Sequence, residues 1–214
     1  MKADYWHNKW ATEDIGFHES EANGLLQKNI QRLELEPNKR LFLPLCGKTR
    51  DIAFLLTQGY RVVGAELSEK AIQTLFDDLA ITPVVHEVGE LLHYSAESID
   101  IFVGDIFKLS KKLLGEVDAI YDRAALVALP EDMRKRYTQH LMAISATAPQ
   151  LAITFEYDQS KMNGPPFSIS QNMIEEYYQA NYSIEHLASN KMSNALKAKI
   201  NAHENAWLLQ RTPS

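Results

Sequence analysis

Short apolar runs alternate with longer amphipathic stretches along most of this 214-residue chain. Apolar runs bounded by polar or turn residues are typical of buried strands, and the stretches between them have helical periodicity. Seven runs fit a strand: 41–45, 61–67, 99–103, 117–121, 151–155, 182–187 and 205–210. Strands joined by helix-length crossovers form right-handed βαβ units, so the pattern predicts a largely parallel sheet with helices on both faces.

Residues with capping preferences mark where several helices begin or end. Gly59 follows the helical pattern of 51–58 and suits the position after a helix C-terminus. Ser68 suits the N-cap of a helix over 69–79. Pro130 suits the first turn of the helix that follows it. These signals predict helices between consecutive strands.

The two ends of the chain depart from this alternation. The segment between 182–187 and 205–210 has no clear amphipathic helix, which favours a C-terminal antiparallel hairpin. Residues 1–31 precede the first strand, and we expect them to form a helical cap. We therefore expect residues 1–214 to form one α/β domain, a three-layer αβα sandwich around a doubly wound sheet.

Composition narrows the class of protein without naming a function. Hydrophobic residues make up 45% and charged residues 23%, as in ordinary globular domains. No apolar run approaches the roughly 20 residues that span a bilayer. The N-terminus lacks an apolar signal segment, and the lone Cys46 excludes an internal disulfide, so we expect a cytoplasmic protein. A net charge of −6 argues against nucleic-acid binding, and we expect a monomer.

The exits of the predicted strands are the candidate ligand site, because doubly wound sheets bind ligands beyond the carboxyl ends of their strands. The first exit contains Gly47-Lys48-Thr49, which resembles part of a phosphate-binding loop. A Walker A loop needs a glycine five positions before Gly47, where Phe42 stands. The dinucleotide fingerprint is also missing, which disfavours a nicotinamide oxidoreductase. A cofactor without phosphates fits this loop better.

Acidic residues lie at the ends of the next two strands or just after them. Glu66 ends the second predicted strand, where a carboxylate can accept hydrogen bonds from both ribose hydroxyls of an adenosine. The alternative is a solvated carboxylate at the start of the following helix. Asp105 can accept from an adenine amine, and Ile106 beside it can cover the ring.

Arg123 directly follows a central strand. A permanent planar cation at this place suits carboxylate recognition or stabilisation of an anionic nucleophile. The alternative is an internal ion pair with Asp122 or with another layer of the fold. The histidines are scattered along the chain, so we expect no metal site. We expect Cys46 to be a buried inert thiol rather than a nucleophile.

The N-terminal segment carries Trp6, Trp10 and Phe17. These aromatic residues either pack the cap onto the sheet or close it over a bound cofactor, with an aromatic face near a cation or a planar substrate.

Several motifs together resemble the thiopurine S-methyltransferase family, in family order over about residues 5–170. They are Tyr5-Trp6 through Trp10, Ile15-Gly16-Phe17-His18, Leu43-Pro44-Leu45-Cys46-Gly47-Lys48, Val62-Val63-Gly64-Ala65-Glu66-Leu67-Ser68, Tyr121-Asp122-Arg123-Ala124-Ala125-Leu126, Glu156-Tyr157-Asp158 and Gly164-Pro165-Pro166-Phe167. The region from Asn190 onward is poorly matched. The resemblance implies a seven-stranded sheet and S-adenosylmethionine as methyl donor, with S-adenosylhomocysteine as product.

The same resemblance assigns roles to individual residues. It places four at the cofactor: Trp10, Leu45, Glu66 and Arg123. It assigns the adenine to Asp105 and Ile106, and the acceptor pocket to Phe17 and Arg123, with Pro166 and the proline before it shaping a lid. The implied acceptors are aromatic or heterocyclic thiols, and selenium or tellurium compounds.

Two alternatives share the same donor site. One is a methyltransferase for halide, thiocyanate or another small nucleophile. The other is a module that binds S-adenosylmethionine without catalysis. A sulfur acceptor has one independent argument, since an acidic thiol needs no dedicated general base and the sequence shows no obvious one.

Overall fold

The computed structural model describes residues 3–12, 19–195 and 200–212. Its centre is a nine-stranded sheet in the order β3-β4-β5-β2-β1-β6-β7-β9-β8. The strands are β1 (Arg40–Pro44), β2 (Arg61–Glu66), β3 (Val84–Val88), β4 (Leu91–Ala96), β5 (Ile99–Val103), β6 (Ala119–Arg123), β7 (Gln150–Glu156), β8 (Tyr182–Ala195) and β9 (Ile200–Arg211). The five strands β5, β2, β1, β6 and β7 run parallel, so the doubly wound α/β prediction is confirmed.

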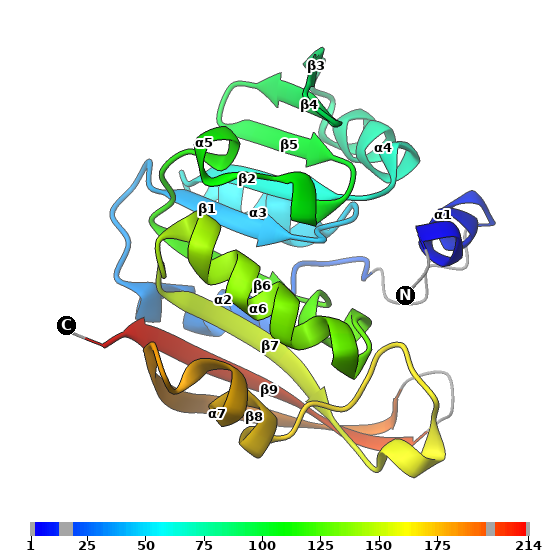
Figure 1. The fold of residues 1–214 in the computed structure, drawn as a ribbon, viewed down its shortest axis with the longest axis vertical. Coiled ribbons are helices and arrows are strands. Elements are labelled where there is room, and N and C mark those ends of the chain that lie inside the picture. Colours follow the sequence, from blue (N-terminus) through cyan, green and yellow to red (C-terminus); the bar gives the residue numbers. More distant parts are fainter. Residues whose placement is uncertain (1–2, 13–18, 196–199, 213–214) are drawn as a thin grey trace.

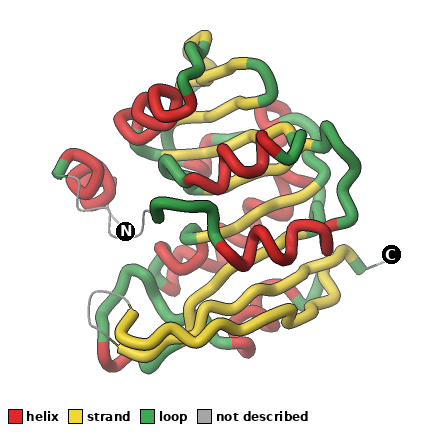
Figure 2. The backbone as a smooth tube through the Cα atoms, turned by 180° about the vertical axis from the view of Figure 1, so that it is seen from behind, coloured by secondary structure: helices red, strands yellow, loops and turns green. Residues whose placement is uncertain are grey.

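Helices cover both faces of this sheet, as Figures 1 and 2 show from opposite sides. They are α1 (Ala3–Ala11), α2 (Gly24–Asn29), α3 (Arg50–Thr57), α4 (Glu69–Leu79), α5 (Lys111–Leu114), α6 (Glu131–Ser145) and α7 (Gln171–Tyr178). Short 3₁₀ turns are η1 (Ile30–Leu33), η2 (Ile106–Lys108), η3 (Leu126–Ala128) and η4 (Gln159–Lys161). One buried cluster joins the sheet to α5, α6 and α7, and a second joins it to α2, α3 and α4. This is the three-layer sandwich that the sequence predicts.

The prediction of seven strands is wrong, because a hairpin of β3 and β4 extends one edge of the sheet (top of Figure 1). β4 pairs antiparallel with β5, and β3 pairs antiparallel with β4. Val84 and Val85 in β3 are 63% and 45% exposed, so this edge strand lacks the apolar face that marks a buried one. The hydrophobic pattern therefore gave no signal for it.

The predicted C-terminal hairpin is confirmed and is longer than expected. β8 pairs antiparallel with β9, which in turn pairs antiparallel with β7. The extra length carries Met192 at the far end of β8, close to the carboxyl ends of the parallel strands, where it lines the cavity described below.

Capping residues place the helices as expected. The Ser68 side chain accepts from the Ala71 N–H at 3.3 Å and begins α4. Gly59 has a φ of +81° just after α3, which explains a glycine there. Thr49 accepts from the Asp51 N–H at 3.3 Å and caps α3. The Gly-Lys-Thr sequence thus serves a helix start here.

The described parts of the N-terminal region contain α1, α2 and η1, as expected for a helical cap. α2 and η1 bury Leu25, Leu26 and Ile30 against the sheet. α1 lies on the side toward which the parallel strands point (right-hand side of Figure 1). This position brings α1 to the strand exits, where ligands bind in such folds.

Candidate functional site

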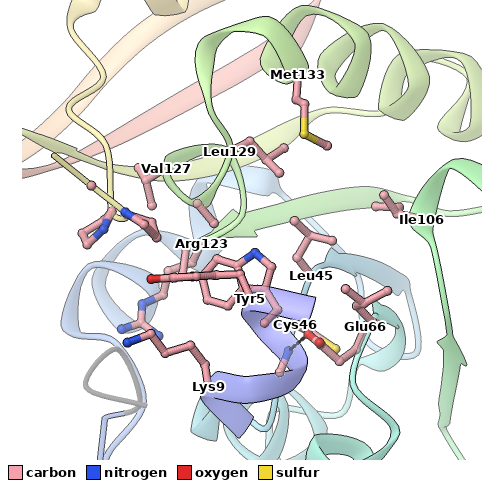
Figure 3. Close-up of a pocket in the computed structure, with 18 of the residues that line it drawn as sticks. Tyr5, Lys9, Leu45, Cys46, Glu66, Ile106, Arg123, Val127, Leu129 and Met133 are labelled. Atoms are coloured by element: carbon pink, nitrogen blue, oxygen red, sulfur yellow. Dashed lines mark hydrogen bonds between the residues drawn. The ribbon is translucent and has the colours of Figure 1, made fainter. Parts of the chain in front are cut away.

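A cavity of about 700 Å³ lies at the carboxyl ends of the parallel strands (Figure 3). Its volume falls in the range of about 300–1,000 Å³ that is usual for small-molecule sites. The exits of β1, β2, β5 and β6 all contribute lining residues, and α1 closes one side. The site is therefore where the strand pattern predicts it.

The loop after β1 forms the floor of the cavity. Leu45 and Gly47 have φ values of +47° and +51°, and the Cys46 N–H donates to the Ala65 carbonyl at 3.0 Å. A Cβ on Gly47 would lie 2.9 Å from the Trp10 ring. A side chain at this position would therefore push the indole away, so the glycine lets Trp10 of α1 pack on the loop. Trp10 is 6% exposed and lines the cavity.

Glu66 is fixed by backbone donors at the end of β2. Its Oε2 accepts from the Gly47 N–H at 2.8 Å, and its Oε1 accepts from the Ser68 N–H at 2.9 Å. The residue is 6% exposed and lines the cavity. Since each carboxylate oxygen has two acceptor sites, Glu66 can still receive ligand hydroxyls while the two N–H groups hold its orientation. The solvated-carboxylate alternative is thus ruled out.

Cys46 lies beside Glu66 in the floor of the cavity (Figure 3). It is 8% exposed. Burial, and secondly the nearby Glu66 carboxylate, raises the pKa of the Cys46 thiol well above its ordinary value, although its backbone hydrogen bond opposes the shift. A thiol held protonated is a poor nucleophile, which supports the inert role expected from sequence.

The exit of β5 supplies an apolar wall beside a carboxylate. Asp105 caps η2, because its Oδ1 accepts from the Phe107 N–H at 3.0 Å, and it lines the cavity. Ile106 is 6% exposed and faces the same space. Both residues line the cavity, and their contact with an adenine stays a prediction. The second carboxylate oxygen of Asp105 takes no part in the cap of η2.

Arg123 reaches the cavity from the end of β6 and is held by carboxylates. Its Nη2 lies 2.8 Å from Glu19 Oε1, and its Nη1 lies 3.7 Å from Asp51 Oδ2. Its side chain is only 10% exposed. Burial alone lowers the pKa of Arg123, but the nearby acidic groups, Asp51 above all and then Tyr121, Glu19 and Glu204, outweigh it and raise the pKa above its ordinary value. The guanidinium is therefore a permanent cation in the wall of the cavity.

The pairing of Arg123 with Asp122 is not found. Asp122 points to the opposite face of β6, where it accepts from the Tyr137 hydroxyl at 2.7 Å and from the Leu126 N–H at 3.1 Å. Burial raises the pKa of Asp122 to about 6, although these hydrogen bonds and one from the Ala125 N–H oppose the shift. The alternative of an ion pair between layers is realised instead, through Asp51 of α3.

Apolar side chains from η3, α6, loops and the late strands also line the cavity. They are Val127, Ala128, Leu129, Met133, Phe155, Met162, Pro165, Pro166 and Met192. Pro166 sits in the expected lid loop, where its carbonyl accepts from the Tyr157 hydroxyl at 2.6 Å. The next residue, Phe167, donates its N–H to the Val127 carbonyl at 2.6 Å, which ties the loop to η3. Phe17, predicted in the acceptor pocket, lies outside the described residues.

Sequence reasoning missed several lining residues. Lys9 lies on the Arg123 side of the cavity in Figure 3, and its Nζ is 5.5 Å from the centre of the Tyr5 ring. Glu19 and Met192 also line the cavity. No local pattern marks these residues, because only the fold brings the two ends of the chain to the strand exits.

Two further properties bear on the class of site. Within residues 3–12, 19–195 and 200–212, the His, Cys, Asp and Glu side chains form no group of three or more that could hold a metal ion. In the same parts of the chain, every helix is too short or too polar to cross a bilayer.

Solved structures show the same fold at low sequence identity. A Burkholderia thailandensis 1,6-didemethyltoxoflavin-N1-methyltransferase with bound S-adenosylhomocysteine matches 97% of this chain and 87% of its own, with a TM-score of 0.65 at 16% identity. The magnesium protoporphyrin IX methyltransferase of Synechocystis, also with bound S-adenosylhomocysteine, matches 97% of both chains with a TM-score of 0.62 at 14% identity.

Sequence relatives identify the family. The thiopurine S-methyltransferase of Xanthobacter autotrophicus is 50% identical over 212 residues, covering 99% of this chain and all of that protein. That of Gluconobacter oxydans is 44% identical over 211 residues, covering 99% and 96%. The family model described as thiopurine S-methyltransferase matches residues 1–212, including the region after Asn190. The chain thus belongs to the thiopurine S-methyltransferase family and is an S-adenosylmethionine-dependent methyltransferase.

Proposed function

We propose that this enzyme methylates the sulfur of aromatic or heterocyclic thiols of the thiopurine type, and that selenium and tellurium compounds are further acceptors. One observation carries the proposal. The Arg123 guanidinium lines a cavity that the apolar residues Val127, Leu129 and Pro166 also line. Such an apolar lining suits a flat ring, and a fixed cation suits an ionised sulfur. The names of the curated relatives agree with this acceptor class.

The residues present fit the cofactor. The Glu66 carboxylate is already oriented by two backbone donors and retains acceptor capacity for ribose hydroxyls. Leu45 and Trp10 line the same cavity, and Asp105 and Ile106 offer one acceptor and one apolar surface for an adenine. When bound, S-adenosylmethionine supplies a methyl group that its sulfonium has already activated. We propose that these five residues and Arg123 hold it.

In this proposal, the chain contributes orientation and charge rather than a base. Correct alignment of reacting groups can lower a barrier by roughly 7–11 kcal/mol. The apolar wall orients the acceptor ring, and Arg123 favours the thiolate over the thiol because an adjacent cation stabilises the anionic form. Pro166 and Phe17 complete the acceptor pocket, and residues 1–31 act as the cap of a single domain over the cofactor.

The test is a radiolabelled methyl-transfer screen with the purified protein. We expect label to appear in 6-mercaptopurine and thiophenol, and in selenite or tellurite products. Iodide and thiocyanate belong in the same screen as acceptors of the alternative class. Transfer to iodide or thiocyanate with none to any thiol would replace the proposed acceptor class. Calorimetric binding of S-adenosylhomocysteine without transfer to any acceptor would indicate a non-catalytic binding module.

We also propose that the enzyme acts as a cytoplasmic monomer on free small molecules. The buried, reduced Cys46 and the net charge of −6 support this setting. Size-exclusion chromatography with light scattering measures the mass directly, and a dimer mass would contradict the monomer.

A further inference from the structure

Arg123 is surrounded by more negative charge than one guanidinium needs. Glu19 and Asp51 pair with it directly, at 2.8 Å and 3.7 Å. Glu204 of β9 adds a third carboxylate whose charge also acts on Arg123. These carboxylates offset the charge of the guanidinium before any anionic ligand arrives, while Lys9 adds a second cation on the same side of the cavity.

The three carboxylates differ in what else holds them. Asp51 is 1% exposed, and it accepts from the Asn23 N–H at 2.7 Å and the Tyr121 hydroxyl at 3.0 Å. Glu204 is 7% exposed and accepts from Asn23 Nδ2 at 2.8 Å. These two are therefore fixed parts of the interior.

Glu19 differs from Asp51 and Glu204 because it is exposed at the cavity rather than fixed in the interior. Its side chain is 43% exposed, and of these three carboxylates, all in the described part of the chain, it is the one that lines the cavity. It therefore covers the side of Arg123 that a ligand can approach. An exposed carboxylate can also leave an ion pair at little cost, because water solvates it.

We propose that Glu19 sets the charge preference of the acceptor site, as the counter-ion that an anionic acceptor must displace from Arg123. The inference rests on the proposed thiol acceptor class. An ionised sulfur and the Glu19 carboxylate cannot both sit against one guanidinium edge without mutual repulsion. A neutral thiol meets no such repulsion. Glu19 therefore weakens binding of ionised acceptors relative to neutral ones of similar size.

The test compares two acceptors in the wild type and in Glu19→Gln. Thiophenol is largely ionised near neutral pH, whereas benzyl mercaptan, an alkyl thiol, stays protonated there. Glu19→Gln keeps the shape of the side chain and removes its charge, while Asp51 remains beside Arg123. We expect the KM of thiophenol to fall about five-fold, because two like unit charges about 4 Å apart repel by about that factor in water and the substitution removes the Glu19 charge. The KM of benzyl mercaptan should stay unchanged.

A second readout is independent of turnover. The dissociation constant of thiophenol, measured by calorimetry with S-adenosylhomocysteine present, should fall by the same factor in Glu19→Gln. Glu21→Gln is the matched control, because Glu21 is exposed two residues further on and is not among the lining residues. It should change neither constant.

The outcomes separate this inference from the proposed function. If the wild type methylates both thiols and Glu19→Gln shifts them equally or not at all, Glu19 has no role in charge preference. Weaker thiophenol binding in Glu19→Gln would also overturn the inference, since it would make Glu19 a support for Arg123 rather than its competitor. Failure of the wild type to methylate any thiol would remove the proposed acceptor class, and this inference with it.

Discussion

The floor of the cavity and its apolar wall are built in different ways. The floor, from the exits of β1, β2 and β5, is fixed by backbone hydrogen bonds such as those that hold Glu66 and Cys46. The apolar wall is made of side chains from η3, α6, the 162–166 loop and β8, and it includes Met133, Met162 and Met192. Methionine is unbranched and polarizable, so this wall can adapt its shape. Under the proposed function, the fixed floor recognises the cofactor strictly and the adaptable wall tolerates different acceptors.

The sharpest way to break this comparison is to remove the fixed acceptor in the floor. Glu66→Ala should weaken S-adenosylhomocysteine binding by at least about 100-fold, because it removes the charged acceptor of two ribose hydrogen bonds that are worth about 1.5–3 kcal/mol each. Calorimetry measures the effect directly. Glu90→Gln, on the exposed turn between β3 and β4, is the control and should bind normally. An unchanged dissociation constant in Glu66→Ala would show that the floor is not the cofactor side.

Arg123 lines the same cavity as the floor and the apolar wall. The importance of its planar guanidinium can be tested without removing its positive charge. Arg123→Lys keeps a cation beside Asp51 and so avoids an unpaired buried carboxylate. We expect kcat/KM for thiols to fall about 10- to 100-fold, because lysine lacks the planar guanidinium with its fixed donors. Steady-state methyl-transfer kinetics give the number. The control is Arg32→Lys, which lies in the exposed ion pair with Glu185 and should retain wild-type values. Full activity in Arg123→Lys would show that the enzyme needs only the positive charge of Arg123.

Asp122 supports the acceptor wall from behind, and its effect on stability should depend on pH. The folded protein holds a proton on Asp122 up to about pH 6, whereas the unfolded chain releases it near 3.8. The folded state therefore binds more protons between these values, so the contribution of Asp122 to stability is full below about pH 4 and is lost as the pH rises past 6. The shift corresponds to about 3 kcal/mol as an upper figure.

The measurement is the free energy of unfolding by urea from pH 4 to pH 7. Asp122→Asn cannot titrate, so the wild-type value minus the variant value should fall by up to about 3 kcal/mol across this range. Asp105→Asn, on an exposed cap, serves as the comparison variant. A constant difference between wild type and Asp122→Asn would mean that Asp122 titrates alike in both states.

The smallest expected effect lies in the adaptable wall. Met162→Leu conserves volume and should change the KM for any one thiol by no more than about ten-fold, since such swaps usually alter energies by less than 1.5 kcal/mol. The rank order of a panel of thiols should change, while S-adenosylhomocysteine binding should not. A panel of KM values tests this prediction. A loss of cofactor affinity in Met162→Leu would show that the walls do not act separately.

Much of the floor could be predicted because each of its residues lies at the end of a strand or within three residues after it. The strand exits are close together in any doubly wound sheet, so locating a strand also locates its exit. Leu45, Glu66, Asp105 and Ile106 were found in this way, and all four line the cavity. The β3–β4 hairpin escaped prediction because its outer strand is exposed and has no apolar face.

The sequence by itself determined the parallel strands of the sheet, most of the helices that cover it and the place of the cavity, since periodicity and capping are local signals. Only the tertiary structure decided what surrounds Arg123. Asp122 is its neighbour in sequence, but successive strand residues point to opposite faces, so Asp122 faces α6 and Arg123 faces α3. The carboxylates that reach Arg123 come from the N-terminal segment, α3 and β9. Contacts between such distant segments follow from how the layers pack, and no local pattern records them.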